Sequence, residues 1–230
     1  WRVWCTNSIY VVSNFGGPVS ASGVGGREPV VPAATEPESA AGRAYTVVRN
    51  RILDGEFEGG SMLSEGRIAT ELGMSRTPVR EAFLQLQAEG WMRLYPKRGA
   101  MVRPVPPHEF REVLQALQII ESAAVRTVCA SRGGSERLVR RLREVTEDQR
   151  RAWEEDDLAA FTRADVEFHR EVVAAGGNSI LQGFHQLLQD RHRRMTTQSV
   201  SDDTTRAQLV LDQHSGLARL IEEGDAEGFA

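Results

Sequence analysis

The sequence predicts a mostly α-helical protein, in which a winged helix-turn-helix is followed by an all-α helical bundle. Two short segments with helical apolar spacing are separated by only Met74 and Ser75, which is the tight turn of a helix-turn-helix. A hairpin pattern follows these two segments. Beyond Pro107 the apolar residues recur at helical spacing, without the alternation typical of strands.

The first predicted domain spans residues 43–104 and contains three helices and a β-hairpin wing. The helices are expected over 43–54, from the N-cap Ser64 to Gly73, and from about Ser75, with Pro78 in the first turn, to Gly90. The segment 57–63 is expected to be a loop. The wing has strands over 92–95 and 100–102, which flank the basic tip Pro96-Lys97-Arg98-Gly99.

The third predicted helix carries the residues best suited to contact DNA. Its apolar stripe consists of Val79, Ala82, Phe83 and Leu86. Arg76 and Arg80 lie away from this stripe, and an arginine there can bind the O6 and N7 atoms of guanine from the major groove. Thr77 and free backbone amides can hold phosphate. The alternative is that Arg80 and Glu81 simply form a solvated face.

The distribution of charge favours a nucleic-acid partner for the first domain. The chain as a whole has a formal net charge of -4. Residues 43–104 hold ten basic and seven acidic residues, a net +3, whereas residues 105–230 hold sixteen arginines and twenty-two acidic residues, a net -6. A basic module joined to an acidic one indicates that only the first contacts nucleic acid.

The second predicted domain, residues 107–230, is a bundle of helices. A long amphipathic helix carries an apolar stripe from Phe110 to Val128, which a single bundle would not cover fully. Further helices are expected at about 135–152, 156–175, 178–194 and 205–223.

Three residues of this second domain could bind a metal. Asp165 and His169 are four apart on a predicted helix and therefore share a face, which also carries apolar residues and should point inward. His214 lies on the inward face of the last predicted helix. Burying a carboxylate is costly unless it is satisfied, and a divalent Zn, Ni or Mn ion would satisfy it. A hydrogen-bonded Asp–His pair in the core is the alternative.

The remaining features concern the N-terminus and the compartment. Residues 1–42 are rich in Gly and Pro and lack an apolar period, so we expect a disordered or non-native tail. Residue 1 is Trp, which suggests a fragment. No apolar run approaches the length of a membrane span, and the two cysteines are far apart, so a cytoplasmic protein without a membrane partner is expected.

Residues 45–103 resemble the winged helix-turn-helix of the GntR family. The matching residues are Tyr45, Ile52, Gly55, Gly60, Leu63, Ala69, Leu72-Gly73, the block Ser75–Ala82, Leu86, Glu89-Gly90 and Gly99. The resemblance implies that Arg76 and Arg80 read base edges, that Ser75 and Thr77 hold phosphate, and that the wing tip Lys97-Arg98-Gly99 enters the minor groove. A position that is often basic falls at Gly66, with Arg67 beside it as the candidate substitute.

Residues 107–230 resemble the FCD effector domain of the FadR subfamily. The matching residues are Glu121, Asp165, Phe168-His169, Asn178, His214 and Gly224-Asp225. The resemblance implies metal ligation by Asp165, His169 and His214. It also implies a further histidine a few residues after Ala230, and hence a domain truncated at its C-terminus. An arginine that often faces the effector is replaced by Leu117. Arg191, Arg193 and Arg194 are the candidate replacements, and His185 and His192 could line the cavity. Of these, Arg191 and His192 are assigned to the effector.

Together these features predict a transcription regulator rather than an enzyme. The FCD resemblance implies a homodimer, which would bind a pseudo-palindromic double-stranded DNA operator. A small organic carboxylate bound at the metal would change operator affinity. Two alternatives remain open at this point: a metal-dependent enzyme that uses the Asp/His site, and a truncated, inactive copy of a regulator.

Overall fold

The computed structural model describes residues 39–131 and 134–229. Residues 1–38, which make up most of the predicted tail, lie outside this described part of the chain. The first domain contains α1 (Ala40–Leu53), β1 (Met62–Leu63), α2 (Glu65–Glu71), α3 (Arg76–Ala88), β2 (Met92–Tyr95) and β3 (Gly99–Val102). Helix α1 begins three residues before the expected boundary at 43, because the Ser39 side chain caps it by accepting a hydrogen bond from the Gly42 backbone N–H (3.0 Å).

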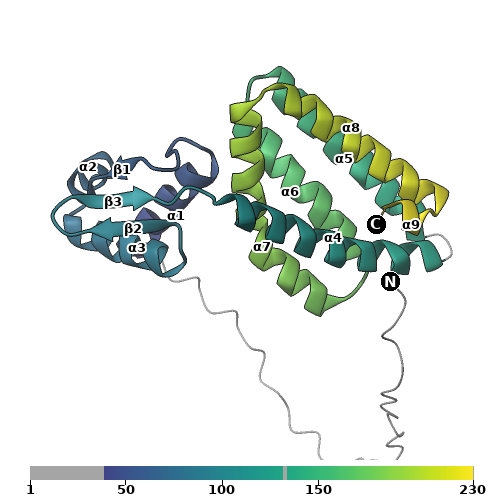
Figure 1. Cartoon of the computed structure of the whole chain (residues 1–230), viewed down its shortest axis with the longest axis horizontal. Coiled ribbons are helices and arrows are strands. Elements are labelled where there is room, and N and C mark those ends of the chain that lie inside the picture. The colour runs from purple at the N-terminus through teal and green to yellow at the C-terminus, as the bar shows by residue number, and fades with distance from the viewer. Residues whose placement is uncertain (1–38, 132–133, 230) are drawn as a thin grey trace, which may run out of the picture. The chain divides into compact units, whose positions relative to one another are not determined.

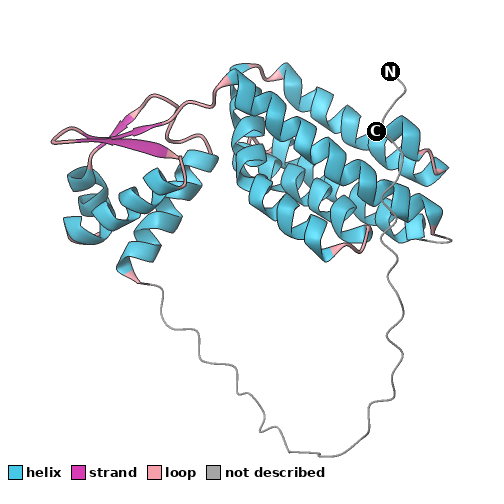
Figure 2. Cartoon of the chain, turned by 60° about the horizontal axis from the view of Figure 1, so that its bottom comes forward, coloured by secondary structure: helices cyan, strands magenta, loops and turns pink. Residues whose placement is uncertain are grey.

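The wing is a three-stranded antiparallel sheet, drawn in magenta in Figure 2. Its strand order is β1-β3-β2 (Figure 1). Strands β2 and β3 agree with the predicted hairpin. Strand β1 was expected to belong to a loop; in the structure Met62 pairs with Met101 and Leu63 with Ala100. Two residues are too few to show an alternating pattern, so only pairing with β3 defines this strand.

The core of the first domain forms where α1 packs on α3. The predicted stripe of α3 is confirmed, since Val79, Ala82, Phe83 and Leu86 are all buried. Val48 and Ile52 of α1 are buried in the same cluster. The opposite face of α3 is thereby left to solvent.

Gly99 is required at the tip of the wing. Its backbone φ angle is +98°, a value that residues with a Cβ atom rarely adopt. A Cβ at this position would lie 2.2 Å from the carbonyl oxygen of Leu63. Glycine therefore allows β3 to approach β1 closely enough to pair.

The second domain is entirely helical within the described residues. It contains α4 (Pro107–Ala130), α5 (Gly134–Glu154), α6 (Leu158–Ala175), α7 (Ser179–Asp202), α8 (Thr205–Glu223) and α9 (Ala226–Phe229). Helix α6 packs against α4, α5 and α7, and α5 packs against α8 (Figure 1). Helix α7 continues eight residues beyond its expected end at 194. The extension places Thr196 on the helix and facing Asp165.

Helix α4 is a packed helix of the bundle. Among the described residues it is the helix that is long and apolar enough to cross a membrane, judged by length and composition alone. Its stripe was expected to remain partly uncovered. Leu117, Ile120, Ala124 and Val128 are buried by the neighbouring helices, whereas Phe110 is only partly buried and Leu114 is 43% exposed, so the N-terminal part of the stripe is indeed uncovered.

A second exposed apolar stripe lies on α7. Ile180, Phe184 and Leu187 are spaced at helical intervals and are 68%, 56% and 73% exposed. Large apolar side chains gathered on one exposed helix face mark an interaction surface.

Candidate DNA interface and metal centre

The N-terminal end of α3 presents the residues predicted to contact DNA. Ser75, Arg76, Thr77 and Arg80 are all exposed. Ser75 occupies the N-cap but makes no side-chain capping bond, so its hydroxyl is not committed to the helix. A helix N-terminus with exposed arginines and hydroxyls suits contact with phosphates and base edges.

A groove of about 630 Å³ runs between α3 and the wing. Its basic lining residues are Arg76, Arg80, Lys97 and Arg98. The Arg76 guanidinium lies over Gly66, where a Cβ would be 3.3 Å from its Nη2 atom. Gly66 therefore leaves room for Arg76. Arg67 is exposed beside the groove but does not line it.

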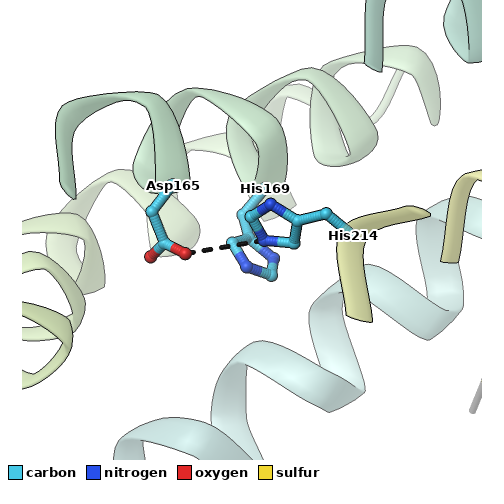
Figure 3. A group of neighbouring side chains, drawn as sticks. All are labelled: Asp165, His169 and His214. Atoms are coloured by element: carbon cyan, nitrogen blue, oxygen red, sulfur yellow. Dashed lines mark ion pairs between the residues drawn. The ribbon is translucent and has the colours of Figure 1, made fainter. Parts of the chain in front are cut away.

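The three candidate metal ligands converge in the second domain. Asp165 and His169 come from successive turns of α6, and His214 approaches from α8 (Figure 3). One potential ligand atom from each lies within 4.8 Å of the others. Asp165 and His214 are buried, and His169 is largely so. The Nε2 atom of His214 is 3.5 Å from Oδ1 of Asp165.

Each of the three residues is held by a hydrogen-bonding partner from another helix; Glu121 and Gln149 are buried and Thr196 is partly buried. Nδ1 of His169 is 2.9 Å from Oε2 of Glu121 on α4. Nδ1 of His214 is 2.8 Å from Oε1 of Gln149 on α5. The hydroxyl of Thr196 on α7 donates to Oδ2 of Asp165 (3.0 Å).

These partners determine which nitrogen of each ring carries the proton. The amide nitrogen of Gln149 donates to the Phe161 carbonyl (3.4 Å), so its Oε1 is the atom that faces His214. An amide oxygen and a carboxylate accept hydrogen bonds, so both rings are protonated at Nδ1. Nε2 is then the nitrogen that each ring has left for a metal, as is usual for histidine ligands with outer partners.

This pattern differs from that of a hydrogen-bonded Asp–His core pair. Within the described residues, the hydrogen bond to the Asp165 carboxylate comes from Thr196, and His169 bonds to Glu121 instead. The imidazoles nevertheless stand around Asp165. The arrangement fits a carboxylate and two imidazoles that share a cation.

The electrostatics of the cluster are consistent with this arrangement. Burial alone would raise the pKa of Asp165, but the imidazoles of His192, His214 and His169 and the hydrogen bond from Thr196 lower it below its usual range. Burial lowers the pKa of His214 to about 3, so its ring is neutral. For His169, burial is outweighed by Glu121 and Asp165, which raise the pKa to about 9, so a metal that binds this ring must displace the proton from Nε2.

A cavity of about 600 Å³ adjoins the three residues. Asp165, His169 and His214 line it, as does His192. The Nε2 atom of His192 lies 3.5 Å from Oδ2 of Asp165. Leu117 also lines the cavity, at the position where the family resemblance often places an arginine.

The predicted effector residue Arg191 does not line this cavity. Its guanidinium pairs with Glu109 and lies over the Trp91 ring, 6.0 Å from the centroid. The neighbouring Arg193 pairs with Asp54. The helical phase of α7 explains the difference, because His192 and Thr196 are four apart and face the cavity while Arg191 does not.

The outer partners were not identified as such from the sequence. Glu121 gave a usable signal, since it is a carboxylate beside Leu117 and Ala124 on the buried face of an apolar helix. Gln149 and Thr196 gave none. Gln149 sits in a highly charged segment, and Thr196 lies beyond the expected end of its helix.

The fold and the exposed basic end of α3 define a winged-helix transcription regulator with a helical second domain. Residues 40–102 match the gntR family of bacterial regulatory proteins, and residues 112–230 match the FCD domain. The chain belongs to the GntR family of DNA-binding transcription regulators and carries an FCD domain, and it is therefore not an enzyme.

Individual relatives agree with this assignment. An uncharacterized HTH-type transcriptional regulator of Agrobacterium vitis is 36% identical over 151 residues, which is 64% of this chain and 88% of that protein. The gluconate operon transcriptional repressor of Bacillus subtilis is 31% identical over 135 residues, 59% of this chain and 54% of that protein. A GntR regulator structure from Rhodococcus sp. RHA1 has the same fold, with a TM-score of 0.67, 23% identity, and coverage of 82% of this chain and 89% of that one.

Proposed function

We propose that a small organic carboxylate, bound at a divalent metal in the FCD domain, controls DNA binding by this regulator. The observation that carries the proposal is the convergence of Asp165, His169 and His214, each held by a hydrogen-bonding partner from another helix, on the wall of a cavity. Metal-binding histidines require such partners to orient their rings.

The donor set suits Zn, Ni or Mn, which bind carboxylate oxygen and imidazole nitrogen. When bound, the metal would supply positive charge and open coordination positions for a carboxylate and a neighbouring hydroxyl. His192 lies on the same wall as the triad, and we assign it to the effector. Thr196 keeps the Asp165 carboxylate oriented toward the cluster.

We propose that α3 reads the operator. Arg76 and Arg80 are placed to reach base edges in the major groove, while Ser75 and Thr77 contact phosphate. Lys97 and Arg98 at the wing tip, with Gly99 shaping the turn, would follow the minor groove, and the exposed Arg67 would contact the backbone. The basic groove between helix and wing supports this arrangement.

We further propose that the regulator is a cytoplasmic homodimer that binds a pseudo-palindromic double-stranded operator. The support comes from the exposed stripe Ile180, Phe184 and Leu187 on α7, which a second copy would cover. A two-fold dimer uses the same patch on both copies, and its two recognition helices then meet two half-sites.

Elemental analysis tests the metal part of the proposal. We expect about one equivalent of divalent metal per purified chain, and a marked loss in His169→Ala and in His214→Ala. His108→Ala is the matched control, because His108 is exposed on α4 and lies outside the cavity. Equal, substoichiometric metal in all of these proteins would show that the triad is a hydrogen-bonded core feature.

A further inference from the structure

We infer that the effector carries one metal-binding head and an apolar body, as in a 2-hydroxy acid with an alkyl chain, in contrast to a polyhydroxylated sugar acid or a dicarboxylate. The inference rests on the proposed function, in that the head must bind at the triad. It adds the polarity of the rest of the effector, beyond the metal-binding head, because the walls of the cavity determine which groups fit there.

The ionisable groups of the cavity gather around the triad. Besides Asp165, His169 and His214 they are Glu121 and His192. The other walls are apolar side chains from α4, α7, α8 and α9: Phe110, Leu114, Leu117, Met195, Val210, Leu217, Leu220 and Phe229. A ligand whose head binds at the triad therefore has its body against aliphatic and aromatic carbon.

The apolar walls favour alkyl groups over hydroxyl groups. Burying one methylene is worth about 0.8 kcal/mol, which is about a fourfold gain in affinity. A hydroxyl that is buried without a partner loses about 5- to 150-fold in affinity. The uncharged Gln118, Ser199 and Gln213 also line the cavity and can satisfy isolated polar groups. An effector with a hydroxyl on every carbon would still place several hydroxyl groups against Leu117, Leu217 and Leu220, where they have no hydrogen-bond partner.

A second carboxylate is disfavoured for an electrostatic reason. Glu121 and Asp165 already place two acidic groups at the polar end of the cavity. Within residues 39–131 and 134–229, the cavity lining contains no arginine or lysine. A carboxylate at the far end of the effector would be desolvated beside apolar side chains without an opposite charge.

Isothermal titration of the Zn²⁺-loaded full chain tests the inference with ligands that share one head. Gluconate and 2-hydroxyhexanoate both have six carbons, a carboxylate and a 2-hydroxyl, and differ in the hydroxyls beyond the second carbon. We expect 2-hydroxyhexanoate to bind at least about tenfold more tightly. Affinity should rise about fourfold per methylene from lactate to 2-hydroxybutyrate to 2-hydroxyhexanoate. The dicarboxylate 2-hydroxyadipate should bind more weakly than 2-hydroxyhexanoate.

A pair of substitutions on α4 tests the wall itself. Leu114 lines the cavity and is 43% exposed, so Leu114→Ser should fold and should weaken 2-hydroxyhexanoate about 3- to 10-fold while leaving lactate unchanged. Ile119→Ser is the matched control, because Ile119 is 64% exposed on the same helix and lies outside the cavity.

The outcomes separate this inference from the proposed function. Equal or tighter binding of gluconate or 2-hydroxyadipate would overturn the apolar body but leave the metal-bound carboxylate intact. An identical loss in Leu114→Ser and Ile119→Ser would also overturn it. If none of the acids binds the Zn²⁺-loaded chain while the operator still does, the proposed effector site fails, and this inference fails with it.

Discussion

Replacing Glu121 by glutamine is expected to weaken metal binding about tenfold. In the structure the Glu121 carboxylate accepts a hydrogen bond from Nδ1 of His169 at 2.9 Å, and both side chains are largely shielded from water. A hydrogen bond to a charged group contributes about 1.5–3 kcal/mol, compared with about 0.5–1.5 kcal/mol for a neutral one. Glutamine keeps the bond but loses the charge. The difference, about 1.4 kcal/mol, is a factor of about ten in Kd.

Glu121→Leu should have the larger effect, because it leaves the Nδ1–H of His169 buried without a partner. Loss of an outer partner costs about 10- to 100-fold in metal affinity, and we expect this variant near the upper end. Competition with a fluorescent zinc chelator at constant pH would measure the Kd of each variant. Glu112→Gln, an exposed carboxylate on the same helix, is the control. Wild-type affinity in both Glu121 variants would refute the orienting role.

Four further predictions concern DNA binding, the wing, the tail and the dimer. Arg80→Ala should weaken operator binding by about 1–3 kcal/mol in a gel-shift titration and relax specificity, while Arg137→Ala, an exposed arginine of the second domain, should not. Gly99→Ala should destabilise the first domain by about 2 kcal/mol or more, because of its positive φ and the clash with Leu63; an unchanged melting temperature would contradict this. Deleting residues 1–37 should leave operator affinity and melting temperature nearly unchanged, and a large loss of either would show that the tail packs on the protein. Phe184→Asp should produce monomers in sedimentation experiments at micromolar concentration, whereas Leu209→Asp, also an exposed apolar residue but on α8, should remain dimeric.

The local pattern of the sequence determined the elements and the residues that share a face. The segment from Ser75 to Gly90 predicted α3, its buried stripe and its exposed arginines, because helical periodicity fixes which side chains lie together. In the same way, the spacing of Asp165 and His169 placed both on one inward face of α6. These relations depend only on residues close together along the chain, so they could be deduced without knowledge of the packing.

The tertiary structure alone decided which side chains meet across helices. Glu121, Gln149 and Thr196 come from three different helices, and nothing in their local sequence states that they surround the triad. The rotation of α7 about its axis turns His192 toward the cavity and Arg191 toward Glu109. The two residues are adjacent in the sequence, and helical spacing alone could not tell which of them faces the cavity. Strand β1 likewise exists only through its pairing with β3. The physical reason is the same in each case: contacts between distant segments depend on how the helices and strands are rotated and packed, and a single sequence records that only indirectly.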